Sequence, residues 1–172
     1  MTTDTTERGF ETLIMRHMTG TDGLASSVGD NVAETQTPYG GTGWIAGRAE
    51  DYDRAYALDM HQRLQFLEAT QPDKLARLNI PDWSNKADIN RQKFLARLSG
   101  ELSSKRGVID VLRKGIAHGP IHLDLFYGTP SHGNEKAAVL HSQNRFSVTR
   151  QLRYSQDETQ RALDLCLFIN GL

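Results

Sequence analysis

The sequence contains one cysteine, Cys166, and no long run of apolar residues. A single cysteine excludes a disulfide within the chain and fits the reducing environment of the cytoplasm. The longest apolar run, residues 165–169, is far shorter than the roughly 20 residues that a membrane-spanning helix needs. The N-terminus, MTTDTTERGF, has neither the basic nor the apolar region of a secretory signal. These absences predict a cytoplasmic protein that is not embedded in a membrane.

Several familiar site motifs are also missing. Residues 40–43, GGTG, lack the Gly-Lys-Ser/Thr ending of a phosphate-binding P-loop. The histidines do not have the spacing of a zinc site, and no serine lies in a nucleophile-elbow pattern. Cys166 lies in an apolar strand pattern, where a thiol behaves as a small hydrophobic group.

The net charge of −1 hides an uneven distribution. Residues 86–115 carry 8 basic and 3 acidic side chains, a net charge of +5, whereas residues 1–85 carry 7 and 13, a net charge of −6. The basic segment is either a solvated helix face or a surface that contacts phosphates. Its candidate DNA contacts are Lys105, Arg106, Arg113 and Lys114.

The first helix is predicted from Glu7 to about Met18, with Thr6 as its N-cap. An apolar arc at helical spacing is expected to face the core: Phe10, Leu13, Ile14, His17 and Met18. Glu7 and Glu11 lie at the edge of that arc or within it. They are either acids favoured by the helix dipole or carboxylates that reach the edge of a sheet.

The middle of the chain predicts a loop over residues 20–47, with room for one short strand, and then a helical region over roughly residues 50–116. Expected helix starts are Asp59, Thr70 with Pro72, Ala87 and Val108. In the helix over residues 87–103, Arg91 is expected on the outer face. The acidic residues Glu50, Asp51 and Asp53 are expected to be solvated surface.

The C-terminal third predicts three core strands, at residues 121–127, 145–154 and 162–169, and a short irregular strand over residues 134–143. The strand over 162–169 is apolar on both faces, as in a central strand covered on both sides, and Asp164 interrupts it. A buried carboxylate needs a cation, a metal or strong donors. Arg150 lies on the same face of its strand as the apolar residues, and it is both the expected partner of Asp164 and a candidate DNA contact. Gln151 and Arg153 face the other way, toward solvent or the DNA backbone.

Asn170-Gly171 then predicts a type I′ hairpin turn. Together, FSVTRQLRYS and RALDLCLFINGL in this C-terminal region, TERGFETLI at residues 6–14 and LSSKRGVIDVLRKGI at residues 102–116 resemble the N-terminal nuclease domain of the R subunit of type I restriction enzymes. The resemblance covers most of the chain and implies a PD-(D/E)XK nuclease fold. The expected fold is therefore α+β, one domain over residues 1–172, with an incomplete nuclease-like mixed sheet flanked by helices.

The resemblance also implies site residues. Asp164 matches the first catalytic aspartate, which in the family binds Mg²⁺ together with a glutamate from a following Glu-x-Lys strand. Glu7 or Glu11 would be the helper glutamate that nucleases of this fold often carry on their first helix. The Glu-x-Lys strand is not in this sequence, so we expect the chain not to cut DNA by itself.

The implied function is Mg²⁺-dependent cleavage of double-stranded DNA, coupled to translocation by an ATP-driven motor that this chain lacks. The implied partners are the modification and specificity subunits. The alternatives are a non-catalytic DNA-binding or subunit-docking module and a purely structural domain. Without the partner strand, one edge of the strand over 162–169 would stay unpaired, which predicts a homodimer or a covering segment there.

Overall fold

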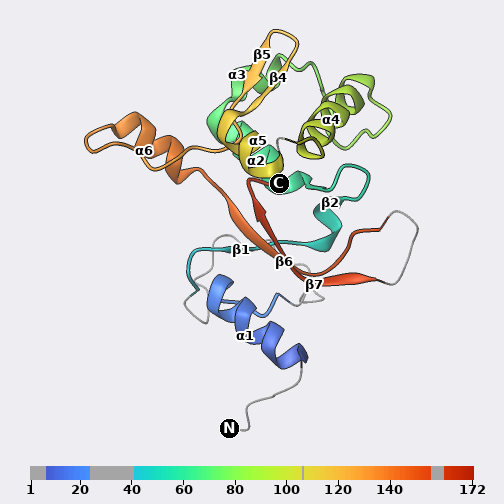
Figure 1. Ribbon diagram of the computed structural model, residues 1–172, viewed down its shortest axis with the longest axis vertical. Helices are drawn as coiled ribbons and strands as arrows, with labels where there is room; N and C mark the ends of the chain where they lie inside the picture. The colour runs from blue at the N-terminus through green and yellow to red at the C-terminus, as the bar shows by residue number, and fades with distance from the viewer. Residues whose placement is uncertain (1–6, 24–40, 106, 156–160) are drawn as a thin grey trace.

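The protein has an α+β fold, seen in a computed structural model that describes residues 7–23, 41–105, 107–155 and 161–172 (Figure 1). Thr6, Arg106 and residues 24–40 of the predicted loop lie outside them. The elements in chain order are α1 (Glu7–Thr19), β1 (Ile45–Ala46), the 3-10 helix η1 (Ala49–Asp51), β2 (Tyr52–Asp53), β3 (Leu58–Asp59), α2 (Met60–Thr70), α3 (Pro72–Ala76), α4 (Ile89–Leu102), α5 (Gly107–Lys114), β4 (Ile116–His118), β5 (Ile121–Leu123), α6 (Glu135–Ser142), β6 (Phe146–Arg153) and β7 (Ala162–Ile169). No helix among the described residues is long and apolar enough to cross a membrane.

The largest sheet has the strand order β1-β6-β7. β6 and β7 pair antiparallel, with Thr149 opposite Cys166 and Arg150 opposite Leu165, and β1 runs parallel to β6. Both long strands begin and end within one residue of their predicted limits, so these two predictions are confirmed. β7 pairs only with β6 within the described residues and is therefore an edge strand.

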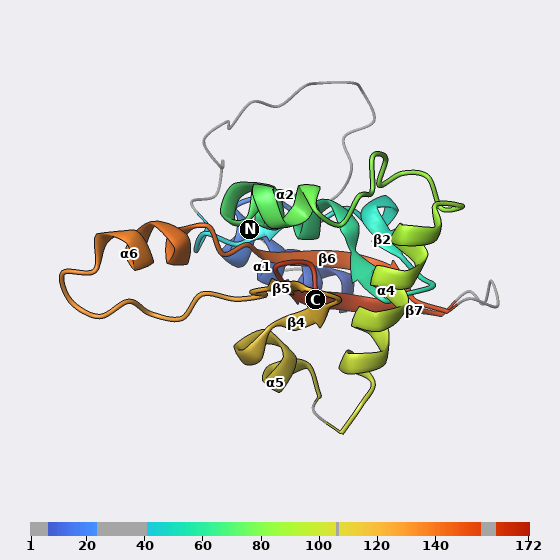
Figure 2. The same ribbon diagram turned by 90° about the horizontal axis from the view of Figure 1, so that it is seen from above.

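Two other strand predictions are wrong. The strand expected over residues 121–127 is the shorter β5, which pairs with β4 in a separate hairpin and not with the main sheet. Gly119, with a φ of 57°, lies in the tight turn that allows this local pairing. Residues 134–143 form helix α6, because the side chain of Asn134 caps it by accepting a hydrogen bond from the Ala137 N–H at 3.1 Å. Figures 1 and 2 show α6 extending away from the body of the molecule.

The main hydrophobic core lies in the helical region, between helices α2 to α5 and the β4–β5 hairpin. The predicted helix starts are confirmed at Asp59, whose carboxylate accepts from the Gln62 N–H at 3.0 Å, and at Pro72, the first residue of α3. The inward face of α4 is also as expected, with Phe94, Leu95 and Leu98 buried. Local capping and helical periodicity were sufficient to predict these helix starts and the inward face of α4.

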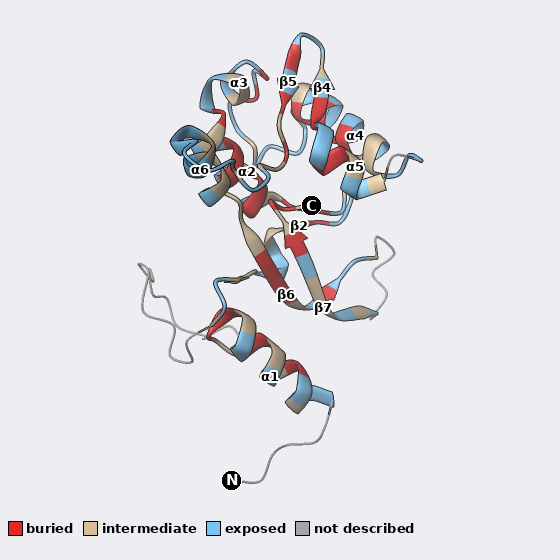
Figure 3. Cartoon of the chain, turned by 60° about the vertical axis from the view of Figure 1, so that its left-hand side comes forward, coloured by how far each residue is buried: buried red, intermediate tan, exposed pale blue. Residues whose placement is uncertain are grey.

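Helix α1 begins at the predicted residue and ends within one residue of the predicted limit, but the buried stripe is rotated away from the expected apolar arc. Phe10 and Leu13, which were expected to face the core, are 65% and 52% exposed. The residues that face the sheet are Glu11, Met15 and Thr19, and Figure 3 shows this buried stripe along α1. The rotation of the helix is set by an ion pair between Glu11 and Arg150 of β6, which outweighs the apolar arc.

A second correction concerns the acidic cluster and α4. Arg91 was expected on the outer face of α4 and Asp53 in solvated surface, but both are buried. Their side chains form an ion pair, with the Arg91 Nη2 donating to the Asp53 Oδ2 at 2.8 Å. Two charges can be buried together because each compensates the other, and sequence position alone does not reveal such a pair.

The Asn170-Gly171 turn has the predicted type I′ geometry. Both residues have positive φ, 52° and 78°, and Ile169 and Leu172 exchange two backbone hydrogen bonds of 3.0 Å. The turn is buried: the Asn170 side chain is fully enclosed and donates to the Leu125 carbonyl at 2.9 Å. The turn therefore fastens the end of β7 to the helical core.

We predict that Asp59→Asn stabilises the protein by about 1 kcal/mol near neutral pH. Asn retains the helix cap, while the Asp59 Oδ2 and the Thr149 Oγ1 are both buried without a partner among the described residues. Burial raises the pKa of Asp59 above 3.8, so folding favours its protonated form. Protonated Asp59 therefore favours the folded state at low pH, and this contribution to the free energy of unfolding is lost as the pH rises through the raised pKa. Urea unfolding at a series of pH values should show the gap between variant and wild type widening upward from about pH 4, and a gap independent of pH would contradict the prediction.

Candidate functional site

Asp164 is exposed, so the prediction of a buried carboxylate is wrong. It is the third residue of β7, where Leu163 and Leu167 are also exposed, by 44% and 56%. Figure 3 shows exposed stretches along this strand. The cause is the order of the strands: β1 occupies the far side of β6 and leaves β7 at the edge. A charge at this position needs no buried partner, and any role of Asp164 has to be argued from its neighbours.

Arg150 pairs with Glu11 and not with Asp164. The Arg150 Nε donates to the Glu11 Oε2 at 2.9 Å, and the two side chains are 8% and 6% exposed. The rest of the guanidinium donates to the Thr12 hydroxyl at 3.0 Å and to the Asp22 and Arg8 carbonyls, each at 3.2 Å. Arg150 therefore holds α1 against the sheet, and the structure does not support its predicted role as a DNA contact.

The Gln151 side chain brings the two carboxylates together. Its Nε2 donates to both oxygens of Glu11, at 3.1 and 3.3 Å, and approaches the Asp164 Oδ1 at 3.4 Å. Gln151 has a φ of 51°, which is rare for a residue with a side chain. Strand alternation placed Gln151 on the face opposite Arg150, but both side chains reach Glu11. No sequence signal marks a left-handed glutamine inside a strand.

The structure distinguishes between the two glutamates of α1. Glu11 is buried and contacts both Arg150 and Gln151, whereas Glu7 is exposed at the first turn of the helix. Glu11 is thus the only one of the pair that reaches the sheet. The sequence did not separate the two, because both lie at the edge of the apolar arc or within it.

The basic residues predicted to bind DNA do not gather around Asp164. Arg153 is exposed at the end of β6, on the neighbouring strand. Lys105, Arg113 and Lys114 are exposed around α5, which Figure 1 places among the helices on the far side of the sheet from α1. The Lys114 ammonium is bonded to the Asp110 carboxylate at 2.8 Å, and Arg106 lies outside the described residues.

The donor set suits a hard cation only in part. Asp164 offers an exposed carboxylate, the oxygen ligand that Mg²⁺ prefers. Both oxygens of Glu11 already accept hydrogen bonds from Gln151, and one of them pairs with Arg150, so Glu11 suits positioning better than metal ligation. Across the described part of the chain, no three His, Cys, Asp or Glu side chains cluster in a way that could hold a metal.

The comparisons with known proteins assign no family to this geometry. No protein-family model, no curated protein and no solved structure matches the chain.

Proposed function

We propose that this chain is a DNA-cleavage module of the type I restriction R-subunit kind, with a PD-(D/E)XK fold. The observation that carries the proposal is the Gln151 amide, which bonds to Glu11 and approaches Asp164 at the exposed edge of β7. The amide links the buried carboxylate of Glu11 to the exposed carboxylate of Asp164, which a cation and a phosphate ester can reach from the edge of the strand. The resemblance of the four sequence blocks supplies the identity of the family.

In this proposal Asp164 is the Mg²⁺ ligand and Glu11 is a positioning residue. Bound Mg²⁺ would polarise the phosphate and activate water. Glu11 holds the Gln151 amide, which orients the Asp164 carboxylate toward solvent. Arg150 neutralises Glu11, so that the charge of Asp164 remains the one available to a cation. The exposure of Asp164 is consistent with access by DNA and a hydrated ion.

The remaining parts of the family's site belong to the proposal as well. In that family a Glu-x-Lys strand follows the hairpin turn, and the Asn170-Gly171 turn directs Leu172 back alongside Ile169. Such a strand would pair along the free edge of β7 and bring its glutamate toward Asp164. Double-stranded DNA, the modification and specificity subunits and the ATP-driven motor would be the partners of the whole enzyme.

We expect Asp164→Asn to weaken Mn²⁺ binding by the 172-residue chain about tenfold. Mn²⁺ replaces Mg²⁺ here because its free-ion signal in electron paramagnetic resonance reports binding directly. Asp73→Asn is the matched control, since Asp73 is an exposed acid in the first turn of α3. Equal Mn²⁺ affinity in wild type and Asp164→Asn would show that Asp164 is not a metal ligand and would contradict the proposed function.

A cleavage assay completes the test. The 172-residue chain is expected to leave plasmid DNA intact in Mg²⁺ or Mn²⁺, because the sequence supplies no Glu-x-Lys pair. Cleavage that is lost in Asp164→Ala would contradict this expectation. If Mn²⁺ binding is absent but duplex DNA binds with an affinity that falls with salt, the non-catalytic DNA-binding module replaces the nuclease.

The open edge of β7 leads us to predict self-association through that strand. Leu167 is 56% exposed, and the outer edge of β7 has no pairing strand in the part of the chain that the structure describes. Backbone groups at such an edge, beside an apolar side chain, favour pairing with a second strand. Leu167→Lys should shift the chain from dimer to monomer in light scattering across the micromolar range. Ile109→Lys, at an exposed apolar position on α5, should not. A wild-type chain that stays monomeric over that range would exclude the edge contact.

A further inference from the structure

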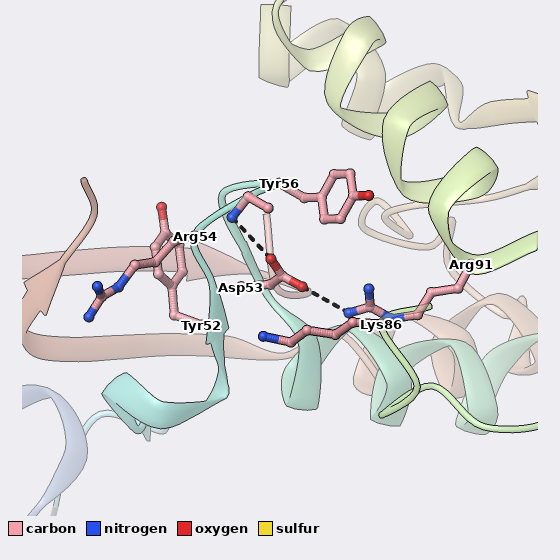
Figure 4. Close-up of a pocket in the computed structure, with 7 residues that line it drawn as sticks. Tyr52, Asp53, Arg54, Tyr56, Lys86 and Arg91 are labelled. Carbon is pink, nitrogen blue, oxygen red and sulfur yellow. Dashed lines mark hydrogen bonds and ion pairs between the residues drawn. The ribbon is translucent and has the colours of Figure 1, made fainter. Parts of the chain in front are cut away.

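A cavity of about 440 Å³ lies where the β2–β3 hairpin meets α4 and the loop before it. Its volume is within the range of small-molecule sites, about 300–1,000 Å³. It contains none of the residues of the Asp164 site. The polar and aromatic residues that line it, which Figure 4 shows, are Tyr52, Asp53, Arg54, Tyr56, Lys86 and Arg91.

Arg91 forms a rigid part of the cavity wall. Its Nη2 donates to the Asp53 Oδ2 at 2.8 Å, and its Nε donates to the Trp83 carbonyl, also at 2.8 Å. The side chain is only 4% exposed. A guanidinium that is already fixed at two nitrogens loses little conformational freedom when a ligand binds to the third.

The third nitrogen of Arg91, Nη1, is available to a ligand. It has no acceptor among the described residues, and it is not one of the polar atoms there that are both fully enclosed and unpartnered. In Figure 4 the dashed line from Arg91 leads to Asp53, and the nitrogen without a dashed line points toward the side of the view on which Tyr56 lies. An unused donor of a charged group at a cavity wall is suited to an anionic oxygen.

The charges of the lining leave one cation for a ligand. Arg91 and Asp53 compensate each other, and the Asp53 Oδ1 is occupied because it accepts from the Ala55 N–H at 3.0 Å. Arg54 already interacts with another group of the protein, so its charge is not counted. The exposed Lys86 ammonium has no hydrogen-bond or ion-pair partner among the described residues (Figure 4). One uncompensated positive charge matches a carboxylate better than it matches a doubly charged phosphate monoester.

Two tyrosines supply the apolar part of the lining. Tyr52 and Tyr56 are both partly buried, and the Tyr52 ring packs on Phe168 at 5.9 Å between centroids. An aromatic ring that is fixed on one side by packing presents its edge or its other face to a flat ligand group. The lining therefore favours an anion that has a flat apolar body.

We propose that this cavity binds a small carboxylate that carries a flat apolar group. The carboxylate accepts a hydrogen bond from the Arg91 Nη1, Lys86 neutralises its charge, and the flat group lies against the tyrosine rings. Asp53 keeps its bonds to Arg91 and Ala55 when the ligand is bound. The chemistry is the same for a free aromatic acid and for the C-terminal carboxylate of a peptide that ends in an aromatic residue. The proposal is independent of the proposed nuclease function.

Ligand-observed NMR titration of the whole chain with hydrocinnamate, hydrocinnamamide and acetate tests the proposal. Hydrocinnamate should bind about tenfold more tightly than either of the others, because the amide lacks the charge and acetate lacks the ring. N-acetylphenylalanine, which adds the acetamido group of a peptide to hydrocinnamate, separates the two sources of the ligand. Tighter binding than hydrocinnamate would identify a peptide end, and weaker binding a free acid; both outcomes support the site.

Two variants test the residues that hold the ligand. Lys86→Gln should weaken hydrocinnamate binding about tenfold and, since Lys86 is exposed, should keep the wild-type melting temperature. Lys136→Gln, on the projecting helix α6, is the matched control and should leave the affinity unchanged. Arg91→Lys keeps a cation beside Asp53 but removes Nη1, so it should also weaken binding. Equal affinities for the acid and the amide, or equal effects of Lys86→Gln and Lys136→Gln, would overturn the proposal.

Discussion

Glu11→Ala should destabilise the protein by about 3–5 kcal/mol, because it leaves the guanidinium of Arg150 buried without its counter-charge. The two side chains are 6% and 8% exposed, and Arg150 cannot reach water without moving α1. The hydrogen bonds from Arg150 to Thr12 and to two α1-side carbonyls hold it in place but do not neutralise it. Urea unfolding followed by circular dichroism at pH 7 measures the loss.

The double variant Glu11→Leu/Arg150→Met provides the control. Replacing a buried ion pair by apolar side chains of similar size is often nearly neutral, so it should cost much less than Glu11→Ala. The coupling energy between the two positions is the stabilisation that the pair itself contributes. A loss below 1 kcal/mol in Glu11→Ala, or a double variant as unstable as the single one, would mean that α1 is held by other contacts.

The elements that the sequence predicted correctly are those set by neighbouring residues. Asp59 and Pro72 mark helix starts through one hydrogen bond or one fixed φ. The β6–β7 pair follows from two long strand patterns, and the Asn170-Gly171 turn from a dipeptide that tolerates positive φ. In each case the determining interaction spans only a few residues or one strand pairing.

The elements that the sequence did not predict depend on contacts between distant residues. Glu11 meets Arg150 across 139 positions, and this pair turned α1 away from its apolar arc. Arg91 meets Asp53 across 38 positions. The exposure of Asp164 depends on which side of β6 the two-residue strand β1 occupies. A strand that is apolar on both faces resembles a central strand, but its place in the sheet is decided by its pairing partners.

Only part of the candidate site could be predicted, because the rest depends on contacts between distant residues. The sequence singled out Asp164 and the alternatives Glu7 and Glu11, but neither the choice of Glu11 nor its connection to Asp164 through Gln151 could be predicted. That connection needs the positive φ of Gln151, a backbone state that no glutamine pattern announces. Side chains alternate between the two faces of a strand only while every residue keeps extended geometry. One residue with left-handed backbone geometry turns its side chain toward a different partner.

Gly171→Ala should destabilise the protein by about 2–5 kcal/mol. Part of this loss, roughly 1–2 kcal/mol, is the cost of holding an alanine at a φ of 78°. The rest, roughly 1–3 kcal/mol, is steric, because a Cβ at Gly171 would overlap the Asp59 carbonyl and come within 2.7 Å of the Arg63 backbone nitrogen. Those are backbone atoms at the start of α2, and they cannot turn aside as a side chain would.

Gly133→Ala separates the two contributions. Gly133 has nearly the same φ, 80°, but a Cβ there would meet nothing within 4 Å. It should therefore show the backbone cost alone, and the difference between the two variants measures the steric contact. Equal losses in thermal or urea unfolding would mean that the turn is not pressed against α2.

The steric contribution matters because the Asn170-Gly171 turn connects the main sheet to the helical core. The Asp59 N–H donates to the Gly171 carbonyl at 3.1 Å, and the Arg63 Nη1 donates to the Asn170 carbonyl at 2.9 Å. Arg63 is 1% exposed, so this end of β7 is closely enclosed, and this burial lowers the pKa of Arg63 to about 9. If the turn moves, β7 loses its anchor in the helical core and Asp164 moves with it. Gly171→Ala should therefore also weaken Mn²⁺ binding at Asp164, whereas Gly133→Ala should leave it unchanged.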